Sequence, residues 1–371
     1  MRKDFEYEFL GKKIVVETGE LAKQANGAVL VRYEDTVILS TAVMSNNVST
    51  ADFFPLTILY QEKLYSVGKI PGGFIKREGR PTDAATLTAR VIDRPIRPMF
   101  DENFRNEVQV VNTVLSVDND YTPEMTALFG TSLALGISSI PFDGPVAGVK
   151  VGKIDGVLKV NPTVEEMERS TIDLTVAGTK NAINMVESGS KEVSEEEMLE
   201  ALMFGHEHIK ELCLIQEDII NEVGKEKISV ELASLDPEIV KEVESDIKND
   251  MVMAIQIKDK LEKYAKIDEL KERAITNYTE KHSESETLES ELKQVKKIAD
   301  NIEGTEVRRL ITDEKVRPDG RGMTEIRELS TRKDLLPRTH GSALFTRGQT
   351  QALAITTLGA LGEHQILDGI M

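Results

Sequence analysis

The stretch from Gly72 to Pro81 combines the residue types that hold a single nucleic-acid strand. It contains three glycines, the aromatic Phe74 and the basic residues Lys76, Arg77 and Arg80. Stacking of bases on an aromatic ring, together with phosphate contacts from Lys and Arg, binds single strands without sequence preference. The alternative is a solvated loop with Phe74 packed at the edge of a core. Composition alone leaves both interpretations open.

Three further arginines follow this stretch. Arg90 and Arg94 are four residues apart and can share one face of a helix, and Arg97 comes three residues later. Clustered guanidinium groups suit phosphate recognition, because each group offers a fork of hydrogen-bond donors. Asp83 and Asp93 are near enough in sequence to pair with these arginines instead. We give RNA contact and internal ion pairing equal weight here.

Other residues with metal-binding or catalytic chemistry are less well placed. His206 and His208 are two apart, so they do not face each other on a helix, and a packed core histidine is expected at His206. Asp118 and Asp120 fit a turn at a strand end. The sequence has no Walker A motif, Rossmann glycine pattern, Gly-x-Ser-x-Gly or Cys-x-x-Cys motif. No catalytic set and no metal site are therefore predicted.

Charge is distributed unevenly along this acidic chain. The net charge is −18, yet the segment from Lys69 to Arg97 has seven basic and three acidic residues. The segment from Asp236 to Glu306 has nineteen acidic and twelve basic residues. A nucleic-acid partner depends on where the positive charges lie, so the net charge does not exclude one.

Composition also bears on the compartment. No apolar run is long enough to span a bilayer, and the N-terminus lacks the apolar core of a secretory signal. Cys213 is the one cysteine and cannot form an internal disulfide, which fits a reducing compartment. We expect a cytoplasmic protein without a membrane partner.

Strand and helix patterns predict an α+β fold for residues 1–235. Apolar and β-branched runs separated by turns predict strands at Lys13–Glu17, Ala28–Arg32, Thr36–Met44, Phe53–Tyr60, Val108–Val117, Val146–Val151, Asp173–Ala177 and Ala182–Glu187. Helices are expected from Thr82 to Asp93, where Pro95 would end the pattern, and from Pro123 to Ser138. A capping box at Ser194 predicts a long helix to about Val223. Strands followed by helices favour α+β over a doubly wound sheet.

The pattern changes at Asp236. Apolar residues spaced by threes and fours from Val240 to Tyr264 predict one amphipathic helix, and the same spacing continues in 267–278 and 288–302. These helices make 236–312 an all-helical domain. A Pro-Asp-Gly turn near residue 318 marks a boundary to a third domain, 313–371.

An internal repeat links the first and third domains. Sliding the chain by 314 residues places the strand that begins at Gly27 on the strand that begins at Gly341. In both copies a polar turn and a strand opened by threonine follow, at Thr36 and Thr350. The shared pattern favours a duplicated domain. Roughly 50 residues of a second copy cannot bury a core, so we expect the chain to be truncated.

Several segments resemble the polynucleotide phosphorylase family, which is built on RNase PH-like domains. The resemblance is carried by Lys69–Pro81, Ala89–Pro98, Val176–Thr179, Met185–Ser188, Arg317–Arg321 and Leu336–Gln351. It runs in order along the whole chain. It implies that 1–235 is a first RNase PH-like domain, 236–312 an all-helical linking domain and 313–371 the start of a second RNase PH-like domain. Exosome-type and tRNA-trimming relatives lack the helical insert and second copy.

The resemblance implies phosphorolytic 3′-to-5′ removal of nucleoside diphosphates from RNA, used in mRNA degradation, and the reverse polymerisation. Inorganic phosphate would be the co-substrate and Mg²⁺ the cofactor of the full-length enzyme, because arginines and a metal ion stabilise charge during the transfer. In the family the metal-binding carboxylates lie later in the second domain, beyond residue 371 here. Single-stranded RNA and further copies of the chain, as a trimer, are the implied partners.

By position, Phe74, Lys76, Arg77 and Arg80 match the family's aromatic and basic loop at the central channel of the trimer. Ile75 stands where many members have a second aromatic residue. The RNA-binding residues predicted from the loop and the arginines together are Phe74, Lys76, Arg77, Arg80, Arg90, Arg94 and Arg97. Two hypotheses remain: part of an active exoribonuclease, or, for the chain as given, a catalytically inert RNA-binding and assembly module.

Overall fold

The computed structural model describes residues 2–49, 51, 53–72, 74–230, 232, 234–363 and 369–370. The chain divides into two compact units. The first unit comprises Met1–Ala233 with Leu367–Met371, and the second comprises Ser234–Ile366. Within the described part of the chain, no helix is both long and apolar enough to cross a membrane.

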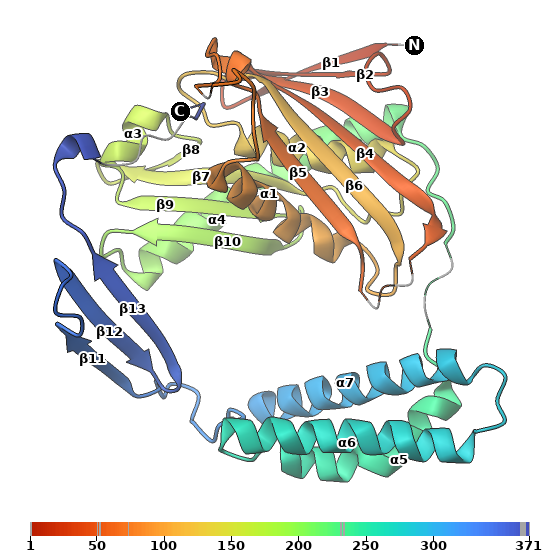
Figure 1. The fold of residues 1–371 in the computed structure, drawn as a ribbon. Helices are drawn as coiled ribbons and strands as arrows, with labels where there is room; N and C mark the ends of the chain where they lie inside the picture. Colours follow the sequence, from red (N-terminus) through yellow and green to blue (C-terminus); the bar gives the residue numbers. More distant parts are fainter. Residues whose placement is uncertain are drawn as a thin grey trace. The chain divides into compact units, whose positions relative to one another are not determined.

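A six-stranded sheet forms one layer of the first unit (Figure 1). Its strands, in sheet order, are β1 (Lys3–Phe9), β2 (Lys12–Thr18), β3 (Gly27–Tyr33), β4 (Thr36–Val48), β6 (Asn106–Ser116) and β5 (Leu56–Glu62). All neighbours pair antiparallel except β5 and β6, which are parallel. The strand predicted at Phe53–Tyr60 corresponds to β5, which begins three residues later, at Leu56, and ends two residues later, at Glu62.

A four-stranded sheet forms a second layer, and helices pack on its faces (Figure 1). The elements are β10 (Ile183–Ser190), β9 (Ile172–Gly178), β7 (Ala147–Ile154), β8 (Val157–Val160), α2 (Glu124–Ile137), α3 (Val164–Arg169) and α4 (Glu195–Val223). α2 packs on both sheets, through β3 and β4 on one side and β7 on the other. Its residues from Met125 to Ile137 are therefore all buried. The α+β prediction is confirmed, as is the capping box at Ser194.

α1 (Asp83–Ile96) begins at the predicted Thr82 N-cap. The expectation that Pro95 ends the helix is wrong. Pro95 lies inside α1, and the chain continues as a 3₁₀ turn, η2 (Arg97–Met99). A proline so near a helix end removes only one backbone bond. Burial of Pro95 and Ile96 holds this last turn in place.

Two hairpins confirm the internal repeat. The second unit carries a three-stranded sheet of β11 (Leu329–Lys333), β12 (Gly341–Arg347) and β13 (Thr350–Thr356). Its β12–β13 hairpin has the same register as β3–β4, shifted by 314 residues: Gly27 pairs with Ala42 and Gly341 with Thr356. The left-handed turn positions correspond too, at Glu34 (φ 51°) and Gly348 (φ 61°).

Burial differs between the two copies. Val31 of β3 is 1% exposed beneath α2, whereas Phe345, the matching residue of β12, is 46% exposed. In β13 every residue is exposed. The second hairpin therefore has the backbone of the first without the covering helix, among the residues that the structure describes.

Three α-helices precede the β11–β13 sheet in the described part of the second unit: α5 (Pro237–Ala254), α6 (Lys260–Lys281) and α7 (Leu288–Thr312). The single helix predicted from Val240 to Tyr264 is wrong. Asp259 interrupts it, because its side chain accepts bonds from the backbone N–H groups of Leu261 and Glu262. This local cap starts a new helix where the apolar spacing alone gave no signal.

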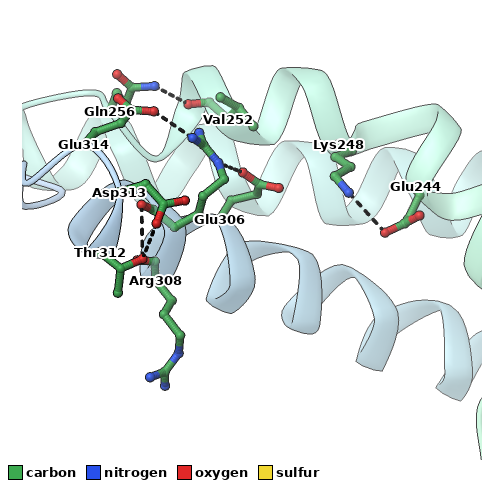
Figure 2. A network of polar contacts seen from close by, with 10 residues as sticks. Glu244, Lys248, Val252, Gln256, Glu306, Arg308, Thr312, Asp313 and Glu314 are labelled. Atoms are coloured by element: carbon green, nitrogen blue, oxygen red, sulfur yellow. Dashed lines mark hydrogen bonds and ion pairs between the residues drawn. The ribbon is translucent and has the colours of Figure 1, made fainter.

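The last turns of α7 contain a buried carboxylate. Glu306 is 5% exposed, and its Oε2 lies 2.7 Å from Nε of Arg309. The same guanidinium bonds Glu314 at 2.7 Å, and the Thr312 hydroxyl donates to the Arg308 carbonyl (Figure 2). Burial of a charge is tolerated only when the charge is paired, so Arg309 stabilises this helix end.

Candidate nucleic-acid interface

The loop before α1 presents apolar side chains to solvent. η1 (Leu64–Val67) precedes it. The Phe74 side chain is fully exposed, at 101%, and Ile70 and Ile75 are 75% and 73% exposed. Phe74 therefore does not pack at a core edge, which was the alternative that the sequence left open. An exposed ring with both faces free is the arrangement that base stacking needs.

Basic side chains surround this ring in the same loop. Lys76, Arg77 and Arg80 are all exposed, and none has a side-chain partner among the described residues. Lys76 has a φ of 51°, in the left-handed region that residues other than glycine seldom occupy. Backbone strain of this kind recurs at ligand-binding loops. The loop thus offers three cationic side chains and one aromatic ring that have no side-chain partner among the described residues.

The loop joins α1 through a defined cap. The Thr82 hydroxyl accepts a hydrogen bond from the Ala85 N–H at 3.0 Å, and Asp83 lies in the first turn. This cap fixes the point where the glycine-containing loop ends and the helix begins. Arg90, two turns further along, is exposed and has no side-chain partner among the described residues.

Arg94 lies on α1 and Arg97 follows its last residue, and both are bound to the protein itself. Arg94 donates to Oε2 of Glu187 at 2.6 Å and to the Val186 carbonyl at 3.2 Å, both on β10. Arg97 donates two hydrogen bonds to the Asp93 carboxylate. It also donates to the carbonyl of Phe54, just before β5, and to that of Leu56, the first residue of β5. The geometry favours internal pairing for these two arginines.

The seven predicted RNA-binding residues therefore fall into two groups. Five are exposed and unpaired within the described residues: Phe74, Lys76, Arg77, Arg80 and Arg90. Two, Arg94 and Arg97, tie α1 to the sheets. The pairing of Arg97 with Asp93 could be predicted from the sequence, because the two residues are one helical turn apart. The pairing of Arg94 with Glu187 could not, because Glu187 lies 93 positions later in the chain.

Sequence reasoning missed a polar cleft between α1, the start of α2 and the four-stranded sheet. Its volume is about 350 Å³, and its lining includes Thr88, Glu124, Lys150, Asp173 and Ser188. Oε1 of Glu124 lies 3.6 Å from Nζ of Lys150, while its Oε2 is buried without a hydrogen-bond partner. Burial and the nearby Glu124 raise the pKa of Glu62.

The remaining sequence candidates have structural roles. His206 is buried, with Nε2 3.0 Å from the Thr179 carbonyl, so the expected core histidine is confirmed. Oδ1 of Asp118 accepts from the Asp120 N–H at 2.7 Å, which is the expected turn. Among the described residues, no group of three or more His, Cys, Asp or Glu side chains could hold a metal ion.

Family models match most of the chain in order. Residues 11–141 match the 3′ exoribonuclease family, domain 1, and residues 144–208 match domain 2 of the same family. Residues 238–322 match the RNA binding domain of polyribonucleotide nucleotidyltransferase. The first two segments correspond to the sheets and helices of the first unit, and the third to the helical part of the second.

Curated relatives are similar over nearly the whole chain. A polyribonucleotide nucleotidyltransferase of Enterococcus faecalis is 60% identical over 360 residues, 97% of this chain and 51% of that protein. One from Anoxybacillus flavithermus is 59% identical over 366 residues, 99% of this chain and 52% of that protein. The chain thus spans about half the length of the curated relatives it matches.

One solved structure, rice Rrp46, covers 59% of this chain and 94% of its own at 11% identity and a TM-score of 0.45. A likeness of that size assigns neither fold nor function. The fold assignment rests on the family models and on the sheet topology described above.

Proposed function

The chain belongs to the polyribonucleotide nucleotidyltransferase family, and we propose that it is the RNA-guiding part of a phosphorolytic 3′-to-5′ exoribonuclease. The whole enzyme would release nucleoside diphosphates from RNA 3′ ends with phosphate, in mRNA degradation. The observation that carries the RNA-guiding role is the set of exposed side chains in this loop that have no side-chain partner among the described residues. It offers Phe74 for stacking beside Lys76, Arg77 and Arg80, on a protein whose net charge is −18.

Charge placement supports a single strand as the partner. The acidic surface elsewhere repels a polyanion, so attraction is concentrated at the loop and at Arg90. A flexible single strand can reach one such loop, and its unpaired bases can stack on Phe74. A duplex keeps its bases stacked inside and would use only the phosphate contacts.

The transfer of the nucleotide is proposed to need residues outside this chain. No group of three or more His, Cys, Asp or Glu side chains that could hold a metal ion occurs among the residues that the structure describes. We propose that the full-length enzyme uses Mg²⁺ with ligands beyond residue 371. There the ion would stabilise the charge that develops as phosphate attacks. Inorganic phosphate is the proposed co-substrate.

Assembly and location are proposed on the same family basis. We propose a homotrimer for the full-length protein, in which the loops of three copies would surround one strand, and a cytoplasmic location. A buried single cysteine, Cys213, is compatible with a reducing compartment.

A second candidate function applies to the chain as given: an inert RNA-binding and assembly module. The specific observation in its favour is that, among the described residues, the second copy of the repeat is seen as the β11–β13 sheet, whose β13 residues are all exposed. Catalysis that depends on a complete second copy would then be absent from this chain.

Phosphorolysis of poly(A) separates these proposals. The chain as given, with phosphate and Mg²⁺, is expected to release no ADP, and ADP release would overturn the inert-module proposal. A chimera that joins this chain to the remaining half of the Enterococcus faecalis relative is expected to release ADP only when phosphate is present. Hydrolysis to AMP without phosphate would contradict the phosphorolytic function.

A further inference from the structure

The segment that follows α4 is fastened to the first unit by its backbone. α4 ends at Val223, and the next residues run beside the end of α2. The Lys225 N–H donates to the Ile137 carbonyl at 3.0 Å, and the Ile228 N–H donates to the Ser139 carbonyl at 2.9 Å. Val230 packs against the hydrophobic core of this unit. We call Gly224–Val230 the connector strap, because the second unit begins at Ser234.

Lys227 holds this strap at its centre. Its Nζ donates to the carbonyls of Leu135, Gly136 and Ser138 at 2.9, 2.8 and 2.7 Å. The last carbonyls of a helix have no partner within the helix, and an ammonium group supplies three donors at once. Positive charge at a helix C-terminus is also favoured by the helix dipole. Lys227 therefore serves as a C-terminal cap for α2 that is contributed by a distant segment.

Protonation of this amine is maintained at neutral pH. Burial lowers the pKa of Lys227 to about 8. At pH 7 most copies of the Lys227 side chain are therefore protonated, so that all three N–H donors are present for the three carbonyls. Lys225 differs, because its exposed side chain makes one bond, to the Asn26 carbonyl at 2.6 Å.

We propose that Lys227 is a clamp that holds the connector strap on the first unit. With the clamp closed, Gly224–Val230 lies along the end of α2. With it open, these seven residues are released from the first unit, a segment that spans about 23 Å at full extension. This conformational role is separate from RNA binding and does not depend on the proposed function.

Hydrogen exchange of the whole protein tests the clamp. In Lys227→Met, peptides that cover the connector strap are expected to exchange about tenfold faster or more at pH 7. This size corresponds to the loss of one or two net hydrogen bonds. Peptides from the middle of α2 and α4 are expected to keep their wild-type rates. Lys225→Met is the matched control, because it removes one exposed contact from the same strap and should change the rates about twofold or less.

Three results would overturn the clamp. The strap could exchange at the wild-type rate in Lys227→Met, or Lys225→Met could accelerate it equally. Acceleration that spreads equally through α2 and α4 would show that Lys227 supports the whole unit rather than the strap. The affinity for oligo(A) is measured on the same two variants. The clamp predicts that this affinity is unchanged, so a failure of the clamp and a failure of the RNA-binding proposal can be told apart.

Discussion

Arg97 and Asp93 form a two-point ion pair one turn apart at the end of α1. Nε of Arg97 lies 2.9 Å from Oδ2 of Asp93, and Nη2 lies 2.8 Å from Oδ1. The same guanidinium donates to the carbonyls of Phe54 and Leu56, each at 3.1 Å. Four bonds from one side chain fasten the helix to the start of β5. Arg97 thus holds the helix that follows the loop of Phe74.

Replacement of Arg97 by Ala is expected to destabilise the protein by about 1–3 kcal/mol. It removes two bonds to backbone carbonyls and an ion pair, and the ion pair counts for little because the Arg97 side chain is 42% exposed. Urea unfolding measures the loss. Arg90→Ala, on α1 and unpaired among the described residues, should stay within about 0.5 kcal/mol. Equal losses for both variants would contradict the structural role of Arg97.

The double variant Phe74→Ala, Arg77→Ala is expected to weaken oligo(A) binding without loss of stability. Stacking of one base is worth about 1–3 kcal/mol, or about 5–150-fold in affinity. Loss of one phosphate contact should also lower the salt dependence by about 0.7 in log–log slope. Fluorescence anisotropy at several salt concentrations measures both effects.

A matched control exists for this double variant elsewhere in the first unit. Phe53 is 64% exposed, and Arg169 is an exposed arginine paired with Asp155. Phe53→Ala with Arg169→Ala removes the same side-chain types and should leave affinity and salt slope unchanged. If both pairs of substitutions weakened binding equally, the attraction would be general and the loop would have no special role.

Sequence reasoning succeeded where the determining interactions are local. The exposed aromatic and basic loop, the caps at Thr82 and Ser194, and the repeated hairpin follow from neighbouring residues and from one shift of the chain. It failed where distant packing decides. Pro95 stays helical because the core buries it, and Arg94 pairs with Glu187 on a strand that only the tertiary fold brings near.

The helix break at Asp259 shows a different limit. Apolar spacing continued through residues 257–264, but the Asp259 side chain bonds two backbone N–H groups and starts α6 there. A cap and an uninterrupted helix compete for the same residues, and periodicity measures only one of the two.

Stability of the helical part should fall as pH falls below about 4.5. The bond from His282 and the neighbouring Lys281 hold the pKa of Glu242 below its ordinary value of 4.5, against the effect of burial. A carboxyl whose pKa is lower in the folded state stabilises the fold above its unfolded pKa. That stabilisation is lost as the folded form takes up a proton. Urea midpoints followed by helix circular dichroism from pH 6 to pH 3 measure the change.

Glu242→Gln is the control for that pH dependence. The amide cannot titrate, so its stability curve should be flatter than that of the wild type over the same range. Glu289→Gln, at an exposed position on α7, should leave the wild-type slope in place. A slope that is identical in wild type and Glu242→Gln would show that other carboxyl groups produce it.

Cys213 is expected to react with a disulfide reagent only when α4 leaves the four-stranded sheet. The side chain is fully buried on α4, and burial raises the pKa of its thiol to about 12. The thiolate is the reactive form, and only on the order of 10⁻⁴ of the native thiols are ionised at pH 8, so the reaction of the native protein is slow. Labelling by Ellman's reagent should be slow in buffer and accelerate through the urea transition. Met203→Cys in a Cys213→Ser background places a thiol at a 50% exposed position of the same helix and should react at once. Native Cys213 that reacted as fast as this control would mean that α4 detaches freely, and the packing described for the first unit would then be wrong.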